Sequence, residues 1–195
     1  MKTYADPSRA EQSAFCLGAY FGFHGEPIDL IISRAYRDFS RTLHGIGDAP
    51  QAEPAARSIL RAALFSLSHN EKICDQCSFD RWHRETEGRL QMAFKAEGYA
   101  AICVGQTQKW INMALKYVFV YGEQRLPGFD RLYPFCHVPI DNILLGKAEI
   151  RDLDEFHCAW SRVNNYDDYL AFQFRVRAKF RGSSPLAVEF HVWAS

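Results

Sequence analysis

Residues 104–118 read VGQTQKWINMALKYV, and this stretch carries the clearest structural pattern in the chain. Gly105 follows a short apolar link and predicts a turn that feeds a helix from about Thr107 to Tyr121. The apolar positions of this helix recur at helical spacing: Ile111, Leu115 and Val118. Three polar side chains share an opposing stripe: Lys109, Asn112 and Lys116. The pattern therefore predicts an amphipathic helix with a lysine-bearing face.

The same helical spacing continues on both sides of this stretch. It predicts helices over about 27–43, 54–67, 78–97, 166–180 and 185–193, with another after Asp141. Pro54 is expected to open the second of these, and Ser78 or Asp80 to cap the third. Residues 172–177 alternate in a way that leaves a strand as the alternative. We expect an all-α fold, a compact helical bundle that forms a single domain over 1–195.

The composition narrows the class of protein. The chain has 195 residues, of which 48% are hydrophobic, and this suits one domain with a sizeable core. No apolar run is long enough to span a bilayer, and the N-terminus lacks the apolar segment of a signal peptide, so we expect a cytoplasmic protein without membrane association. Lys plus Arg equals Asp plus Glu at 23 each, so a site for a polyanion must be a local patch.

The six cysteines show no disulfide-framework spacing. Cys74 and Cys77 form one C-x-x-C pair, but no second pair follows at zinc-ribbon spacing. His83 completes a metal site only if a distant ligand such as Cys136 or His157 joins it. Reduced thiols without a metal are the favoured interpretation, and no cofactor is predicted.

A second motif, HVPIDN at 137–142, places Asp141 32 positions after Lys109 (141 minus 109). Pro139 restricts Val138 to an extended conformation, and aspartate is among the best helix N-caps. Asp141 is therefore expected to cap the next helix. Lys109 is expected in the first turn of its own helix, where the positive end of the helix dipole disfavours a protonated amine. A nucleophilic lysine beside a carboxylate is one reading, and an ordinary surface lysine with a simple cap is the other.

The two motifs together resemble the helix-hairpin-helix DNA glycosylases, in particular the archaeal-type 8-oxoguanine DNA glycosylases and small bacterial proteins related to them. The resemblance covers about 98–142, with residues 100–103 (AAIC) where the family usually has Pro-Gly before the Val-Gly turn. It implies that Lys109 is the catalytic lysine and Asp141 the catalytic aspartate. It also implies a bifunctional enzyme that flips a base out of double-stranded DNA, forms a lysine Schiff base and nicks the strand.

Further residues are candidates for binding. Four are expected near a flipped base: His137, Gln106, Gln108 and Trp193. Four form the densest basic run and are candidates for contact with the DNA backbone: Arg175, Arg177, Lys179 and Arg181. For the first group core packing is the alternative, and for the second a solvated basic face.

The excised base is left open by the sequence. It is either an oxidised purine, which implies DNA repair, or a hypermodified base of phage DNA, which implies antiviral defence. No G-x-S-x-G elbow or phosphate-binding loop is present to suggest other chemistry. One alternative to an enzyme is a non-catalytic DNA- or protein-binding module of the same fold, and another is a small helical protein of toxin–antitoxin or other regulatory type. No obligate protein partner is evident.

Overall fold

A computed structural model describes residues 6–43 and 51–194. Every regular element in these residues is a helix and none is a strand, which confirms the all-α prediction. The α-helices are α1 (Arg9–Phe21), α2 (Pro27–Ser40), α3 (Ala52–His69), α4 (Gln76–Ala96), α5 (Val104–Tyr121), α6 (Asn142–Leu145), α7 (Tyr166–Lys179) and α8 (Pro185–Ala194). Three short 3₁₀ helices are η1 (Asp130–Phe135), η2 (Arg151–Leu153) and η3 (Trp160–Arg162). None of the described helices combines the length and apolar composition needed to cross a membrane.

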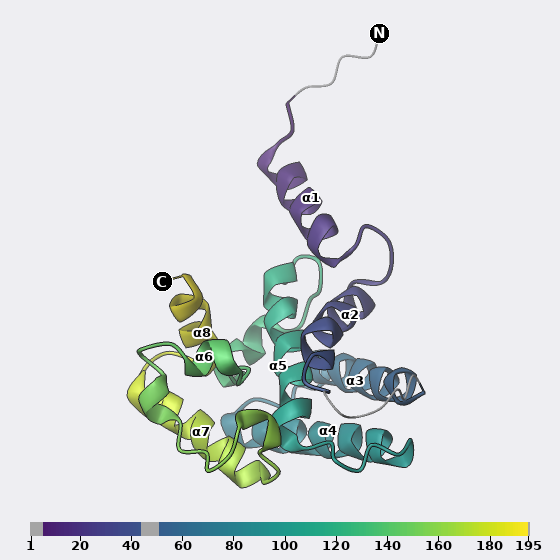
Figure 1. The fold of residues 1–195 in the computed structure, drawn as a ribbon. Coiled ribbons are helices and arrows are strands. Elements are labelled where there is room, and N and C mark those ends of the chain that lie inside the picture. The colour runs from purple at the N-terminus through teal and green to yellow at the C-terminus, as the bar shows by residue number, and fades with distance from the viewer. Residues whose placement is uncertain (1–5, 44–50, 195) are drawn as a thin grey trace.

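Helix α5 stands at the centre of the fold (Figure 1). Helices α2, α3 and α4 lie on one side of it, α6, α7 and α8 lie on the other, and α1 projects away from the body (Figure 1). Between Val104 and Val118, every residue except Lys109 and Lys116 is buried. The predicted amphipathic helix is thus a core helix, and its two lysines are the positions that stay partly open.

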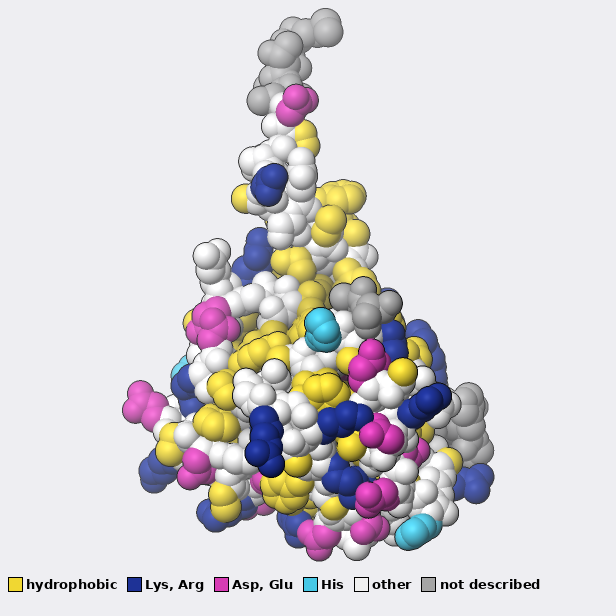
Figure 2. Space-filling view, turned by 90° about the vertical axis from the view of Figure 1, so that its left-hand side faces the viewer, with side chains coloured by type: hydrophobic (Ala, Val, Ile, Leu, Met, Phe, Trp, Pro, Cys, Tyr) yellow, Lys and Arg dark blue, Asp and Glu magenta, His cyan; other side chains and the backbone are white. Residues whose placement is uncertain are grey.

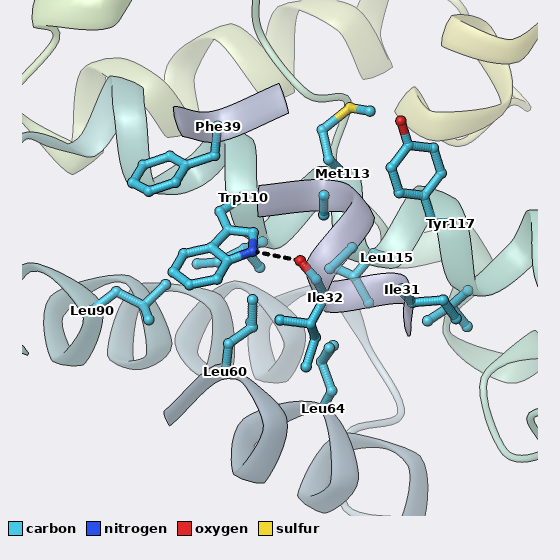
Figure 3. Close-up of a cluster of buried hydrophobic side chains, with 14 of the residues drawn as sticks. Ile31, Ile32, Phe39, Leu60, Leu64, Leu90, Trp110, Met113, Leu115 and Tyr117 are labelled. Atoms are coloured by element: carbon cyan, nitrogen blue, oxygen red, sulfur yellow. Dashed lines mark hydrogen bonds between the residues drawn. The ribbon is translucent and has the colours of Figure 1, made fainter. Parts of the chain in front are cut away.

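Two groups of buried apolar side chains flank α5. The larger group centres on Trp110, whose indole N–H donates to the carbonyl oxygen of Ile32 at 3.2 Å (Figure 3). Phe39 stacks on the same indole with ring centroids 5.1 Å apart. The second group joins α6, α7, α8 and η3 around Tyr169 and Phe172. Both groups pack against α5, so its orientation is fixed from both sides.

The structure corrects the predicted start of α5. The helix begins at Val104, so Gly105 is its second residue rather than a turn. A Cβ at this position would overlap the carbonyl oxygen of Trp160, which explains why the position needs glycine. Lys109 is consequently the sixth residue of α5 and lies beyond the first turn, where the helix dipole has little effect.

Other local predictions also need revision. Asp75 caps α4, and Ser78 is its partner in a capping box rather than the cap itself. Pro54 lies inside the first turn of α3, which begins at Ala52. Residues 172–177 belong to α7, so the strand alternative is wrong. Helices α4 and α5 are consecutive and contact each other, while the helix-hairpin-helix character of this pair stays a prediction.

Candidate functional site

One face of α5 lines a cavity of about 490 Å³. The helix contributes side chains spaced three or four residues apart along this face: Lys109, Met113, Lys116, Tyr117 and Val120. Residues of α1, α2 and α8, together with the N-cap and first residues of α6, complete the wall: Tyr20, Arg34, Asp38, Arg41, Asp141, Ile143, Glu189 and Trp193. The cavity is therefore built around the only two residues of the buried part of α5 that retain partial exposure.

Lys109 and Asp141 meet at the wall of this cavity. Lys109 Nζ donates to Asp141 Oδ2 at 3.1 Å, and the two side chains are 13% and 15% exposed. Asp141 Oδ1 accepts from the backbone N–H of Leu144 at 2.8 Å, which confirms that Asp141 caps α6. The ammonium also lies 5.3 Å from the centroid of the Trp160 ring. The carboxylate thus has one oxygen fixed by the cap and the other directed at the amine.

Gln108 holds the segment that presents Asp141. Its Nε2 donates to the carbonyl oxygens of Ile140 and Gly105, each at 2.9 Å. Its Oε1 accepts from the backbone N–H of Ile140 at 3.2 Å and from Asn112 Nδ2 at 3.0 Å. Because the amide binds both backbone groups of Ile140, α5 fixes the position of the residue that precedes Asp141. Gln108 is fully buried and does not line the cavity, so its predicted role in substrate binding is replaced by a positioning role.

A second lysine–carboxylate pair lies about two turns further along α5. Lys116 Nζ donates to Glu189 Oε1 at 2.7 Å, and the Glu189 side chain is only 3% exposed. Burial raises the pKa of Glu189 to about 7, against the opposing effect of Lys116. Glu189 Oε2 is buried and has no hydrogen-bond partner among the described residues. The carboxyl group that pairs with Lys116 therefore keeps one buried oxygen without a partner among the described residues, and the sequence analysis did not single out Glu189.

Trp193 lies beside this second pair. The Lys116 ammonium is 5.0 Å from the centroid of the Trp193 ring. The ring itself is half exposed, at 50%, and lines the cavity. This is the one residue among the four predicted to bind a base that the structure brings to Lys109 and Asp141.

His137 and Gln106 lie elsewhere. The His137 ring is completely buried, with Nε2 2.8 Å from Asp80 Oδ1 and Nδ1 2.8 Å from the Tyr169 hydroxyl. Burial lowers its pKa despite the neighbouring carboxylate, so the ring is neutral and packs the interior. Gln106 Nε2 donates to the carbonyl oxygen of Thr42 in a separate hollow at the start of α5. Neither side chain lines the Lys109 cavity, so the structure does not bring these two predicted substrate contacts to Lys109 and Asp141.

The basic run does not form a continuous strip. Arg175 binds the Leu153 carbonyl oxygen, Arg177 binds those of Pro134 and Phe135, and Lys179 pairs with Asp152, while Arg181 is exposed. Residues two apart on a helix point in nearly opposite directions, since each residue turns it by about 100°. On the face that includes α7 and α8, basic and acidic side chains are interspersed (Figure 2). The basic residues of α7 mainly bind neighbouring segments of the same chain. Their contacts give no support to the predicted binding of the DNA backbone.

Metal chemistry has no visible basis in the described part of the chain. Within it, no three His, Cys, Asp or Glu side chains are grouped as a metal site would require. All six cysteines are free thiols, including exposed Cys74 and Cys77.

Comparisons with known proteins leave the site to be judged on its geometry. No family model, curated protein or solved structure matches the chain.

Proposed function

We propose that this chain is a DNA glycosylase in which Lys109 is the nucleophile and Asp141 its carboxylate partner. The observation that carries the proposal is the meeting of these two side chains at 3.1 Å on the wall of one cavity, although they are 32 positions apart in the sequence. The sequence motifs single out both residues before their proximity is known. The proposal includes a cytoplasmic location and double-stranded DNA as the substrate.

The chemistry follows from the roles of the two groups. After Lys109 gives a proton to Asp141, the Nζ lone pair attacks C1′ of the flipped nucleotide. The C1′–N bond breaks, its electron pair leaves with the base, and the base takes the proton that Asp141 holds. The sugar ring then opens as nitrogen forms the C1′=N bond and O4′ takes the proton that nitrogen releases. Loss of a proton from C2′ breaks the C3′–O bond and nicks the strand.

The surroundings of the pair suit this reaction. Once Asp141 has passed its proton to the departing base, its negative charge again lies close to the carbon that is electron-poor, and the backbone amide at Leu144 holds the carboxylate in place. Trp193 lines the cavity and offers an aromatic face for a base that has left its stack. A cavity of about 490 Å³ falls in the range of pockets that hold small molecules.

Borohydride trapping tests the proposal directly. The protein is incubated with duplexes that contain 8-oxoguanine or a hypermodified pyrimidine, borohydride reduces any imine to a stable amine, and the crosslinked peptide is identified by mass spectrometry. We expect a crosslink at Lys109, loss of the crosslink in Lys109→Gln, and its retention in Lys116→Gln. A crosslink at Lys116 contradicts the assignment. Salt-sensitive DNA binding without release of any base supports the non-catalytic module instead.

A further inference from the structure

The cavity continues along α5 beyond the group that the proposed reaction uses. We define the outer compartment as Tyr20, Arg34, Asp38, Arg41 and Tyr117, which line the same cavity as Lys109. Lys109 and Tyr117 are eight positions apart on α5, which corresponds to about 12 Å along the helix axis. The walls therefore extend from the nucleophile through the Lys116–Glu189 pair to the outer compartment, and a ligand held at Lys109 has room in that direction.

From this arrangement we infer that the excised base carries a hydroxyl-rich substituent, such as a hexose, which the outer compartment binds. The inference rests on the proposed glycosylase function and specifies its substrate class. It selects the hypermodified base over the oxidised purine, because an oxidised purine has no group that reaches beyond its own ring.

The outer compartment is a connected hydrogen-bond network. Arg34 donates to Asp38 Oδ2 at 3.1 Å and to the Tyr20 hydroxyl at 2.8 Å. The Tyr117 hydroxyl also donates to Asp38 Oδ2, at 2.6 Å, and lies 3.0 Å from the Tyr20 hydroxyl. Burial and the neighbouring Asp38 raise the pKa of Tyr117, so its phenol keeps its proton. Three helices, α1, α2 and α5, thus hold these groups in a fixed arrangement.

Some hydrogen-bonding groups of this network are still available to a ligand. Among the described residues Asp38 Oδ1 has only a long contact, 3.8 Å, with Arg41, whose side chain is 73% exposed. A guanidinium has five N–H donors, and Arg34 directs only some of them at Asp38 and Tyr20. The compartment therefore offers acceptors and donors side by side. The Tyr20 ring, which is 44% exposed, adds an aromatic edge to the cavity.

This mixture of groups suits hydroxyls better than other ligand chemistry. A hydroxyl both donates and accepts, so it pairs with a carboxylate and a guanidinium at once. A phosphate only accepts, and the carboxylate of Asp38 repels it while occupying Arg34. An unsubstituted ring leaves these polar groups without partners, which costs free energy in a partly buried site. The charge pattern thus favours a neutral polyol.

Matched substrates test the inference. The full-length protein is incubated with duplexes that contain 5-hydroxymethylcytosine, the same base with a hexose on its hydroxymethyl oxygen, or 8-oxoguanine, and base release is followed by mass spectrometry. We expect release of the hexose-bearing base at least about tenfold faster than release of 5-hydroxymethylcytosine, since one well-made hydrogen bond is worth about that factor. Asp38→Ala should bring this ratio close to one.

Two further variants guard against misfolding. Asp38→Asn keeps the shape of the side chain, and Tyr117→Phe removes one hydroxyl; each should lower the ratio while thermal melts confirm a folded protein. Asp29→Ala is the matched control, because Asp29 is another α2 carboxylate paired with an arginine, Arg61, and lies outside the cavity. It should leave the ratio unchanged.

The outcomes separate the two proposals. Equal release of both cytosines, or a ratio that survives the Asp38 variants, overturns the inference. The glycosylase proposal still stands in that case if Lys109 becomes crosslinked to the sugar of the duplex that contained 8-oxoguanine. If Asp38→Ala accelerates all substrates alike, the compartment contacts a DNA phosphate and the inference is wrong. If no duplex yields a released base or a crosslink, both the glycosylase function and the hydroxyl-rich substrate are wrong.

Discussion

Glu189 allows a quantitative test of how the cavity is built. Its carboxyl group is 3% exposed, and burial raises its pKa from 4.5 to about 7. The folded protein therefore holds this proton more tightly than the unfolded chain. The stability that follows is fully present below about pH 4.5 and is lost as the pH rises through about 7. At 1.36 kcal/mol per pKa unit, the loss amounts to roughly 3 kcal/mol.

The perturbation is Glu189→Gln, which removes the titrating proton and keeps the size of the side chain. Urea unfolding of both proteins at pH 5, 6, 7 and 8 gives their free energies of unfolding. We expect the variant to gain about 1 to 3 kcal/mol relative to the wild type between pH 5 and pH 8. Glu155→Gln is the control, since Glu155 is 66% exposed, and its difference from the wild type should not change with pH.

Comparison at each pH isolates Glu189 from other buried groups. Burial lowers the pKa of both His83 and His137, so the folded protein keeps these rings neutral. Their contribution is present above the unfolded pKa of about 6.5 and is lost as the pH falls, which is the opposite sign. The histidine contribution is the same in the wild type and the variant, so it cancels when their free energies of unfolding are subtracted. A difference that stays within about 0.5 kcal/mol from pH 5 to 8 would refute the argument from burial.

Two further variants test the support of α5. Gly105→Ala should destabilise the protein by about 1 to 3 kcal/mol in urea unfolding, because the added methyl group overlaps the Trp160 carbonyl oxygen. The control is Gly88→Ala, which lies in the open middle of α4 and should be neutral or stabilising. Equal effects of the two substitutions would contradict the packing argument. Gln108→Glu replaces the Nε2 donor by an acceptor that faces the Ile140 carbonyl oxygen. We therefore expect the free energy of unfolding to fall by about 2 kcal/mol and the crosslinking at Lys109 to become slower. The control is Gln12→Glu on the surface, which should change neither quantity.

Lys109 and Asp141, the proposed catalytic pair, could each be singled out from a local sequence signal. The proline step before Asp141 and its capping position depend on neighbouring residues alone, and the helix that carries Lys109 follows from apolar spacing. Their 3.1 Å contact depends on long-range packing, since Gln108 on α5 binds the backbone of Ile140. Sequence spacing alone does not show that this contact forms.

The errors have the same physical origin. His137 was placed near the substrate because it precedes the Val-Pro-Ile-Asp step, but adjacency in the chain does not fix the direction of a side chain, and Asp80 and Tyr169 draw this ring into the interior. The basic run fits one edge only if its residues form a strand, and helix α7 divides it between opposite sides. Glu189 had one signal that was overlooked: it is the only carboxylate within the apolar helix α8.

The cost of the two lysine–carboxylate pairs argues for a role other than stability. Taking a charged pair out of water costs free energy that its mutual attraction only partly returns, so apolar residues of similar size usually serve a core helix as well or better. Helix α5 is apolar or hydrogen-bonded in the interior wherever it faces another helix, and it carries charge only at Lys109 and Lys116, where it faces the cavity. The two pairs differ: both Asp141 oxygens have partners, whereas the buried Glu189 Oε2 has none among the described residues. A buried oxygen without a partner among the described residues costs further free energy, so packing alone does not account for the Lys116–Glu189 pair.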